Sequence, residues 1–412
     1  MMSAYSRALR YALGSLVILS VCTPGESSSV ALGTIETLAS PAAAGSGEPN
    51  LSAGPDGRAY LSWIEPAADS SQALRFATLD GDRWSAPRTI AQRKDFFVNW
   101  ADFPSVVPLA GRTVAAHWLQ RSGTAKYAYD VRIAQSADGG DTWSTPVVPH
   151  RDGTQTEHGF ASLFAFRDSL AVVWLDGRNF ARVTKGEKAD MMLVTTKLAA
   201  NGATGDERVL DARVCDCCQT SWAVASSGPV VVYRDRLNGE VRDISLVRWS
   251  DSGWTQGSLV HADGWNIDFC PVNGPAVAAE GQRVAVAWFT GARDTSRVLL
   301  ARSDDGGASF GPPVRIDDGK PVGRVDIELD DHGGALVSWM EFTSGQQADV
   351  RVRRVDADGA LGRSVVVARS SGERASGFPR MVIAGGQLIF AWTEGGERAG
   401  VRVARARLTG AR

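Results

Sequence analysis

One pattern recurs seven times along this chain, and it constrains the fold more than any other feature. Each copy is a short apolar segment, a turn that contains glycine, and an alternating apolar segment that ends in an aromatic residue. The copies span residues 49–63, 103–118, 160–174, 219–233, 273–288, 325–339 and 378–392. Their final aromatic residues, spaced 51 to 59 residues apart, are Trp63, Trp118, Trp174, Tyr233, Trp288, Trp339 and Trp392.

This period predicts a repeated sheet rather than a repeated helical hairpin. It fits four antiparallel strands with their turns, which form one blade of a β-propeller. A third strand is recognisable after several copies, at 131–134, 192–194 and 298–301, and a fourth follows a glycine-rich turn. The sequence therefore predicts an all-β, seven-bladed propeller in one domain over residues 30–412.

The last repeat predicts how the ring closes. Residues 401–404 supply a third strand after the last copy, and the sequence given continues only to Arg412. The segment 30–38 is apolar in part and precedes the first copy without a partner of its own. We expect it to be the outermost strand of the seventh blade, because pairing there removes an open sheet edge.

Composition narrows the range of partners. The chain has 44 basic and 46 acidic side chains, so it lacks the positive surplus that neutralises a phosphate backbone. We expect no nucleic-acid partner and a monomeric protein. The 44 Gly and 13 Trp fit many tight turns and large packing units.

The first residues are typical of an export signal. Arg7 and Arg10 precede an apolar stretch at 11–21 that is too short to span a bilayer, and Cys22 follows. Leu19-Ser20-Val21-Cys22 resembles the lipobox of bacterial lipoproteins, which implies a lipid on Cys22; plain secretion is the alternative. We expect an export signal at 1–22, a tether at 23–29, and a periplasmic or cell-surface protein whose only membrane contact is such a lipid.

Two turns carry a recognisable motif. Residues 136–143 match Ser-x-Asp-x-Gly-x-Thr-Trp, residues 303–310 nearly match it, and residues 79–84 and 250–254 are degenerate copies. The motif resembles the Asp-box, or BNR repeat, of the sialidase-like superfamily. The resemblance implies a propeller with these turns on the face opposite the ligand site. Members of that superfamily include exo-sialidases, other glycosidases and binding proteins, so the fold alone does not select a function.

The cysteines after the signal segment form an unusual group. They are Cys215, Cys217, Cys218 and Cys270. Their even number in an oxidising compartment favours one or two disulfides between blades four and five. The alternative is a soft-metal site for copper or zinc, with His158 as a further ligand.

The loops that enter each first strand and leave each second strand of a propeller emerge on one face. We expect their polar residues to line an axial bowl. The candidate catalytic carboxylates are Asp102, Glu157, Asp216, Asp235 and Asp268. The candidate ligand-binding residues are Arg178, Arg234, Arg242, Arg293 and His158, since a guanidinium binds a carboxylate through two parallel hydrogen bonds. Rim salt bridges are the alternative for these residues and for Glu65, Asp176 and Glu341.

Three functions fit these features. The favoured one is the binding of a glycan, another small ligand or a metal in the bowl. The second is an exo-glycosidase, a sialidase-like hydrolase of an acidic sugar. Sialidases use three arginines, a tyrosine paired with a glutamate, and an aspartate acid/base; here their Arg-Ile-Pro signature is absent and no tyrosine–glutamate pair is found by motif. The third is a structural role in assembly.

Overall fold

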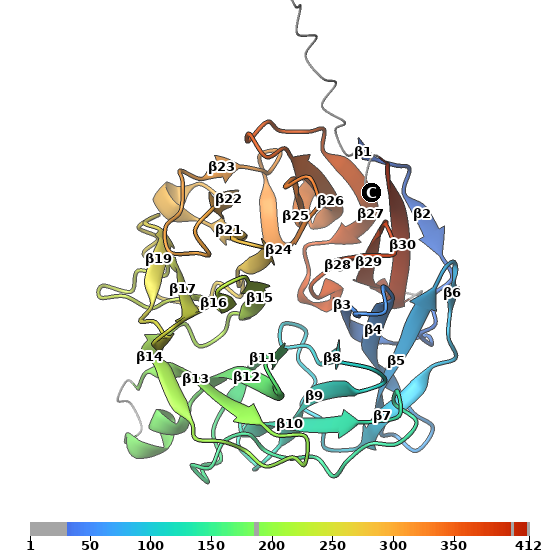
Figure 1. The fold of residues 1–412 in the computed structure, drawn as a ribbon, viewed down its shortest axis with the longest axis vertical. Helices are drawn as coiled ribbons and strands as arrows, with labels where there is room; N and C mark the ends of the chain where they lie inside the picture. Colours follow the sequence, from blue (N-terminus) through green and yellow to red (C-terminus); the bar gives the residue numbers. More distant parts are fainter. Residues whose placement is uncertain (1–30, 185–188, 397–398, 410–412) are drawn as a thin grey trace, which may run out of the picture.

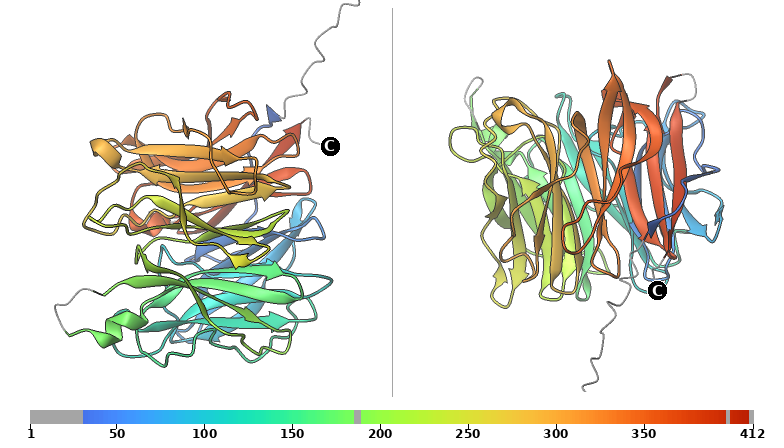
Figure 2. Two further views of the ribbon diagram at one scale, coloured as in Figure 1. Left: turned by 60° about the vertical axis from the view of Figure 1, so that its left-hand side comes forward. Right: turned by 90° about the horizontal axis from the view of Figure 1, so that it is seen from above.

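Seven β-sheets surround a central axis in the computed structural model, which describes residues 31–184, 189–396 and 399–409 (Figure 1). The predicted all-β, seven-bladed propeller is therefore confirmed. Seen from the side, the strands of neighbouring blades stack closely around the ring (Figure 2). The predicted export signal and tether lie outside the described residues. Within the described part, no helix is long and apolar enough to cross a membrane.

The first four blades follow one another along the chain. Blade 1 contains β3 (Gly47–Ala53), β4 (Ala59–Pro66), β5 (Gln72–Asp80), β6 (Arg83–Trp84) and β7 (Arg88–Arg93). Blade 2 contains β8 (Ser105–Pro108), β9 (Val114–Arg121) and β10 (Tyr129–Ser136). Blade 3 contains β11 (His158–Phe166), β12 (Ser169–Asp176), β13 (Met191–Leu198) and β14 (Arg208–Val214). Blade 4 contains β15 (Ser221–Ala225), β16 (Gly228–Arg234), β17 (Ile244–Ser250), β18 (Gly253–Trp254) and β19 (Ser258–His261).

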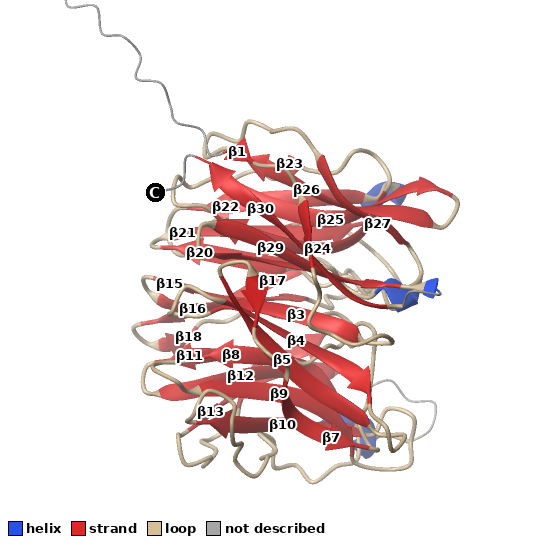
Figure 3. Ribbon diagram, turned by 90° about the vertical axis from the view of Figure 1, so that its right-hand side faces the viewer, coloured by secondary structure: helices blue, strands red, loops and turns tan. Residues whose placement is uncertain are grey.

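The last three blades complete the ring. Blade 5 contains β20 (Ala276–Glu280), β21 (Arg283–Thr290), β22 (Arg297–Ser303) and β23 (Val314–Arg315). Blade 6 contains β24 (Pro321–Leu329), β25 (Ala335–Ser344), β26 (Gln347–Val355) and β27 (Val365–Ser371). Blade 7 contains β28 (Arg380–Ala384), β29 (Gln387–Glu394), β30 (Gly400–Thr409), β1 (Ala31–Leu32) and β2 (Glu36–Leu38). Apart from three short 3-10 turns at 178–182, 292–294 and 374–376, the described chain is strand and loop (Figure 3).

Blade 2 departs from the expected four strands. Its sheet has three, and the segment after the Ser136 turn contributes only an isolated bridge between Ile133 and Val147. Pro146 and Pro149 flank this segment. Proline has no N–H to donate, so it interrupts the ladder that a fourth strand would need.

The N-terminal segment closes the ring as expected. β1 pairs antiparallel with β30 through Ala31 opposite Thr409, and β2 pairs with β30 through Glu36 opposite Arg405. Between the two strands, the Gly33 N–H donates to the carbonyl oxygen of Arg407 at 2.8 Å. The outer edge of β30 is therefore covered by the start of the described chain.

The seven repeated aromatic residues of the second strands are all buried between neighbouring sheets, and each strand continues beyond its aromatic residue. Three of the tryptophans donate their indole N–H to a carboxylate two residues later, which points to the same side of the strand. The bonds are Trp63 to Glu65 at 2.7 Å, Trp174 to Asp176 at 2.8 Å, and Trp339 to Glu341 at 2.6 Å. These three carboxylates, expected on the ligand-binding rim, therefore hold the core tryptophans in place.

The turn that follows β10 is organised around Asp138. Its carboxylate accepts hydrogen bonds from the Ser136 hydroxyl at 2.7 Å, the Thr142 hydroxyl at 2.6 Å, and the N–H groups of Asp141 and Thr142 at 3.0 and 2.9 Å. Asp305 accepts the matching bonds from Ser303 and Ser309 in the turn after β22. Hydrogen bonds from Thr142 and Ser136 hold the pKa of Asp138 well below its usual range.

Replacing Asp138 with Ala should lower the thermal unfolding temperature, because the turn loses a single acceptor for several donors. Differential scanning calorimetry measures the change. The matched control is Asp251→Ala in the degenerate turn between β17 and β18, where the side chain is exposed. Equal melting temperatures for the two variants would contradict the role given to Asp138.

Candidate functional site

One face of the ring gathers most of the predicted site residues. First strands begin there and second strands end there, as the pairing of His158 with Asp176 shows. The turns after Ser136 and Ser303 lie at the other ends of their strands. On the first face, five segments from blades 2 to 5 meet. We call this group the mouth and define it as Asp102, Tyr129, Glu157, residues 215–218 and residues 268–270.

Two carboxyl groups and a tyrosine form one side of the mouth. Asp102 is buried and accepts the Phe160 N–H at 2.8 Å, and half-buried Glu157 accepts the Tyr129 hydroxyl at 2.7 Å. Gly159 makes this packing feasible, since a Cβ there would collide with the Asp102 carboxylate and the Tyr129 ring. The three side chains thus form a single connected group.

Both carboxyl groups hold their protons unusually well. Burial, with the nearby charge of Glu157, raises the pKa of Asp102 to about 8. Burial, with the charge of Asp216, raises the pKa of Glu157 to about 7. Carboxyl groups with shifted pKa values cluster at functional sites, because catalysis and binding use burial and neighbouring like charges to shift them. These two groups therefore mark the mouth as the candidate site.

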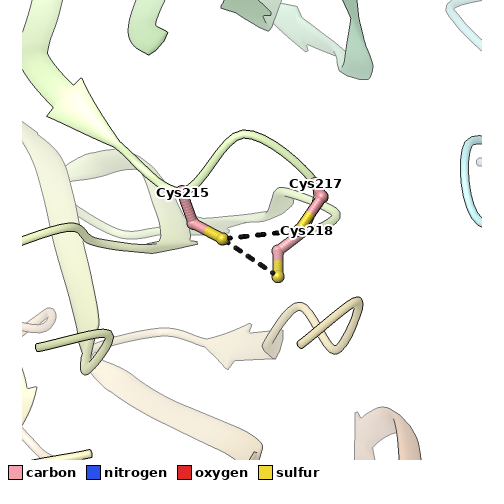
Figure 4. Close-up of side chains that lie close together, drawn as sticks. All are labelled: Cys215, Cys217 and Cys218. Carbon is pink, nitrogen blue, oxygen red and sulfur yellow. Dashed lines mark hydrogen bonds between the residues drawn. The ribbon is translucent and has the colours of Figure 1, made fainter. Parts of the chain in front are cut away.

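The cysteines form the other side of the mouth. Cys215 and Cys218 are buried, Cys217 is half-buried and Cys270 is exposed. Figure 4 shows the first three side chains turned toward one another, with Sγ–Sγ distances of 3.7 Å for Cys215–Cys217 and 3.5 Å for Cys215–Cys218. The predicted disulfides are not formed in this structure, in which all four cysteines are free. The two Sγ–Sγ distances are also well above the roughly 2.05 Å of an S–S bond. Hydrogen bonds from the two neighbouring thiols lower the pKa of Cys215.

Two buried arginines lie close to the cysteines. Arg234 is 1% exposed and donates to the backbone carbonyl oxygens of Asn273, at 3.0 and 2.8 Å, and of Phe289, at 2.7 Å. Arg242 is 4% exposed and donates to Glu240 at 2.9 Å, while its Nη1 lies 3.9 Å from Asp216. Arg234 therefore joins blade 4 to blade 5, and neither guanidinium is presented to solvent as a clamp for a ligand.

Two other predicted ligand-binding residues belong to a separate cluster. Arg178 pairs with Asp176 and Glu207, each at 2.6 Å. His158 is buried, stacks on His150 at 3.7 Å between ring centroids, and lies 3.1 Å from Asp152. Burial alone would lower the pKa of His158, but the bond to Asp152 and the charge of Asp176 raise it. The structure therefore places His158 among aspartates rather than with the cysteines.

The remaining candidates divide between core and surface. Asp235 is buried and accepts the Ser245 hydroxyl at 2.8 Å, and burial raises its pKa to about 6. Asp268 and Arg293 are exposed. Asp268 belongs to the mouth, two residues before Cys270, whereas Arg293 lies in a 3-10 turn after β21 with a φ of 57°.

An axial cavity of about 530 Å³ lies between the first strands of all seven blades. Most of its lining residues are small, polar atoms cover slightly more of its surface than apolar ones, and Asp326, Glu328 and Arg380 contribute charge. Burial raises the pKa of Glu328 to about 8, and Arg380 Nε lies 3.4 Å from Asp326. This cavity and the mouth are lined by different residues: strand residues line the cavity, whereas most residues of the mouth lie in loops.

Sequence reasoning missed Tyr129, Gly159 and His150. Tyr129 begins a third strand, a position the search for entering and leaving loops did not cover. The strand order could have indicated Tyr129, because each third strand begins on the face of the ring where the second strand ends. Gly159 could be recognised only once the two side chains that it accommodates were known.

No protein-family model matches the sequence, and no curated protein matches it. Solved structures with the same architecture do. A protein of unknown function from Dyadobacter fermentans is 13% identical with a TM-score of 0.51, over 92% of this chain and 99% of that one. The polysaccharide lyase Uly1 is 10% identical with a TM-score of 0.50, over 88% and 90%. The Hadza microbial sialidase Hz136 is 12% identical with a TM-score of 0.49, over 83% and 74%. At these identities the similarity to the first two proteins is one of fold alone.

Proposed function

We propose that this chain is an exported Asp-box propeller that binds a carbohydrate at the mouth. One observation carries the proposal. The loop 268–270 of blade 5 folds onto blade 4, where the Cys270 thiol lies 3.6 Å from the Asp216 carboxylate. This loop leaves the side chain of Phe269 72% exposed, between Asp268 and Cys270 of the mouth. We infer that this ring is the apolar contact for a ligand whose polar groups meet the polar residues on the same face.

The chemistry of the mouth complements a sugar. An aromatic ring covers the apolar C–H face of a pyranose, while hydroxyl groups need partners that both donate and accept. A protonated carboxyl group offers both functions. With pKa values of about 7 and 8, Glu157 and Asp102 keep a proton over much of the neutral range. We expect the half-buried Glu157 to contact the ligand. Tyr129 holds its carboxyl group through a hydrogen bond, and the buried Asp102 lies close to it.

The rest of the proposal rests on the sequence. The turn motifs at 136–143 and 303–310 support the Asp-box assignment, and residues 1–22 support export to the periplasm or cell surface, with Cys22 as the lipid site. The similarity in fold to a polysaccharide lyase makes acidic and neutral polysaccharide fragments the first ligands to test.

Screening the full chain on a glycan array, followed by calorimetric titration of the best ligand, tests the proposal. Phe269→Ala should weaken binding about tenfold, which is the order of the loss when a stacked aromatic side chain is truncated. Leu361→Ala is the matched control, since Leu361 is also exposed but lies between the third and fourth strands of blade 6. Equal loss in both variants, or no bound glycan at all, would refute the proposal.

Hydrolysis of an acidic sugar is a second candidate because of the Tyr129–Glu157 bond. The structure joins a tyrosine to a glutamate beside Asp102, the combination that the sialidase resemblance implies. The Tyr129 ring is fully buried against Phe97, however, with ring centroids 3.9 Å apart. Binding is therefore favoured. Release of free sugar from an acidic-sugar glycoside by wild type, and its loss in Tyr129→Phe with binding retained, would instead support the hydrolase.

A further inference from the structure

The spacing of the buried sulfur atoms is that of metal ligands. A disulfide needs about 2.05 Å between sulfurs. Thiolates around a tetrahedral zinc ion, each with a bond of about 2.3 Å, lie about 3.8 Å apart along the edges of the tetrahedron. Here Cys215 Sγ is 3.5 Å from Cys218 Sγ and 3.7 Å from Cys217 Sγ. The three sulfur atoms lie within 4.8 Å of one another, so one ion can reach them all.

A fourth sulfur approaches from the next blade. The first three cysteines follow β14 and precede β15, whereas Cys270 precedes β20. The ligand atoms of Cys217, Cys270 and Asp216 also lie within 4.8 Å of one another. Cys217 therefore belongs to both groups, and Cys270 lies within 4.8 Å of it from the next blade. Four-coordination by all four sulfurs requires the exposed Cys270 loop to move toward Cys215 and Cys218 when the ion binds.

The surroundings supply the charge that thiolates need. Two guanidiniums, those of Arg234 and Arg242, are buried beside the cysteines. The hydrogen bonds of Arg234 all go to backbone carbonyls in the described chain, so they leave its charge without a carboxylate. Arg242 pairs with the Glu240 carboxylate at 2.9 Å, while its Nε and Nη1 have no hydrogen-bond partner among the described residues. A buried positive charge is costly unless an anion compensates it, and for Arg234 the neighbouring sulfur atoms are placed to do so.

We propose that Cys215, Cys217, Cys218 and Cys270 bind one soft d10 cation, Zn²⁺ or Cu⁺, as thiolates. Binding releases the four thiol protons to solvent, and no electron is transferred. Four thiolates carry two net negative charges with Zn²⁺ and three with Cu⁺, and the Arg234 guanidinium offsets one of them. Thiolate ligands select Zn²⁺ and Cu⁺ over harder cations. Metal binding does not depend on a bound sugar. The metal proposal therefore goes beyond the carbohydrate proposal and would still hold if no carbohydrate bound.

Metal content and thiol protection together test the site. The full chain is exported in a bacterial host supplied with zinc or copper, purified without oxygen, and analysed by elemental mass spectrometry. We expect about one equivalent of Zn²⁺ or Cu⁺ per chain, the stoichiometry of a single closed thiolate site. Alkylation followed by peptide mapping should find these four cysteines protected until a strong chelator is added.

Two variants separate ligands from neighbours. Cys218→Ser should lose nearly all of the metal, because it removes a buried ligand, whereas Asp251→Ser on the opposite face should keep it. Phe269→Ala should also keep its metal, which distinguishes this site from the sugar-binding surface. Full metal content in Cys218→Ser would overturn the proposal.

A measurement on the wild type alone covers the case in which Cys218→Ser does not fold. Reduced, metal-free protein is titrated with Co²⁺. Tetrahedral thiolate ligation gives intense visible bands and a sulfur-to-metal charge-transfer band that saturate at about one equivalent. A weak octahedral spectrum would refute the site. So would four cysteines found as two disulfides with no metal in the protein isolated without oxygen.

Discussion

A chain that begins at Ala39 should fail to close its ring and should aggregate. The deletion removes β1 and β2, leaves the outer edge of β30 unpaired, and takes away Leu32, Ile35 and Leu38, which pack against the core of blade 7. An unpaired edge is a template for pairing with other chains. Together the lost hydrogen bonds and apolar contacts should cost roughly 3–6 kcal/mol of unfolding free energy.

Size-exclusion chromatography with light scattering and urea denaturation measure the effect. The control is a chain that begins at Ala31 and therefore keeps both strands. We expect this control to be monomeric and as stable as the full chain. If the chain from Ala39 is equally monomeric and equally stable, the closing strands contribute nothing and the account of the seventh blade is wrong.

Raising the pH from 5 to 8 should destabilise the protein through Asp102. Burial raises the pKa of this carboxyl group to about 8 in the folded chain, whereas an unfolded chain has a value of about 3.9. Between these values the folded state holds a proton that the unfolded state has released. The contribution of Asp102 to stability is therefore complete below the unfolded pKa and falls by roughly 1.4 kcal/mol per pH unit until the folded pKa is passed.

Asp102→Asn should make this part of the profile shallower, because the amide cannot ionise and its oxygen can still accept the Phe160 N–H. A slope from Glu157 and Glu328, whose pKa values are also raised, should remain. Urea denaturation at intervals of one pH unit gives the slopes. Asp251→Asn, an exposed aspartate on the opposite face, should keep the wild-type slope. Parallel profiles for Asp102→Asn and the wild type would show that Asp102 is ionised in the folded chain.

The architecture could be predicted because it depends on periodic apolar burial. Seven aromatic residues at near-constant spacing define the second strands, and all seven are buried. Closure of the ring was also predictable, because the sequence shows an unpaired strand before the first repeat and an incomplete blade after the last one. The missing fourth strand of blade 2 was not, although Pro146 and Pro149 carried the signal.

The site was less predictable because side-chain partners are set by the folded backbone. The order of the strands in each repeat was enough to predict that Glu157, Asp216 and Cys217 lie on one face of the ring. It could not show that Glu65, Asp176 and Glu341 serve tryptophans, although the two-residue spacing to each tryptophan was visible in the sequence. Likewise, His158 finds His150 and Asp152 only because a loop folds back on its strand.

The pairing of β30 with β1 and β2 also fixes the order in which the molecule can be finished. The first strands to be synthesised and the last one belong to the same sheet. During vectorial synthesis, β1 and β2 therefore stay unpaired until β30 has been made. The ring remains an open arc until then, and a chaperone that protects the nascent chain has two sheet edges to shield.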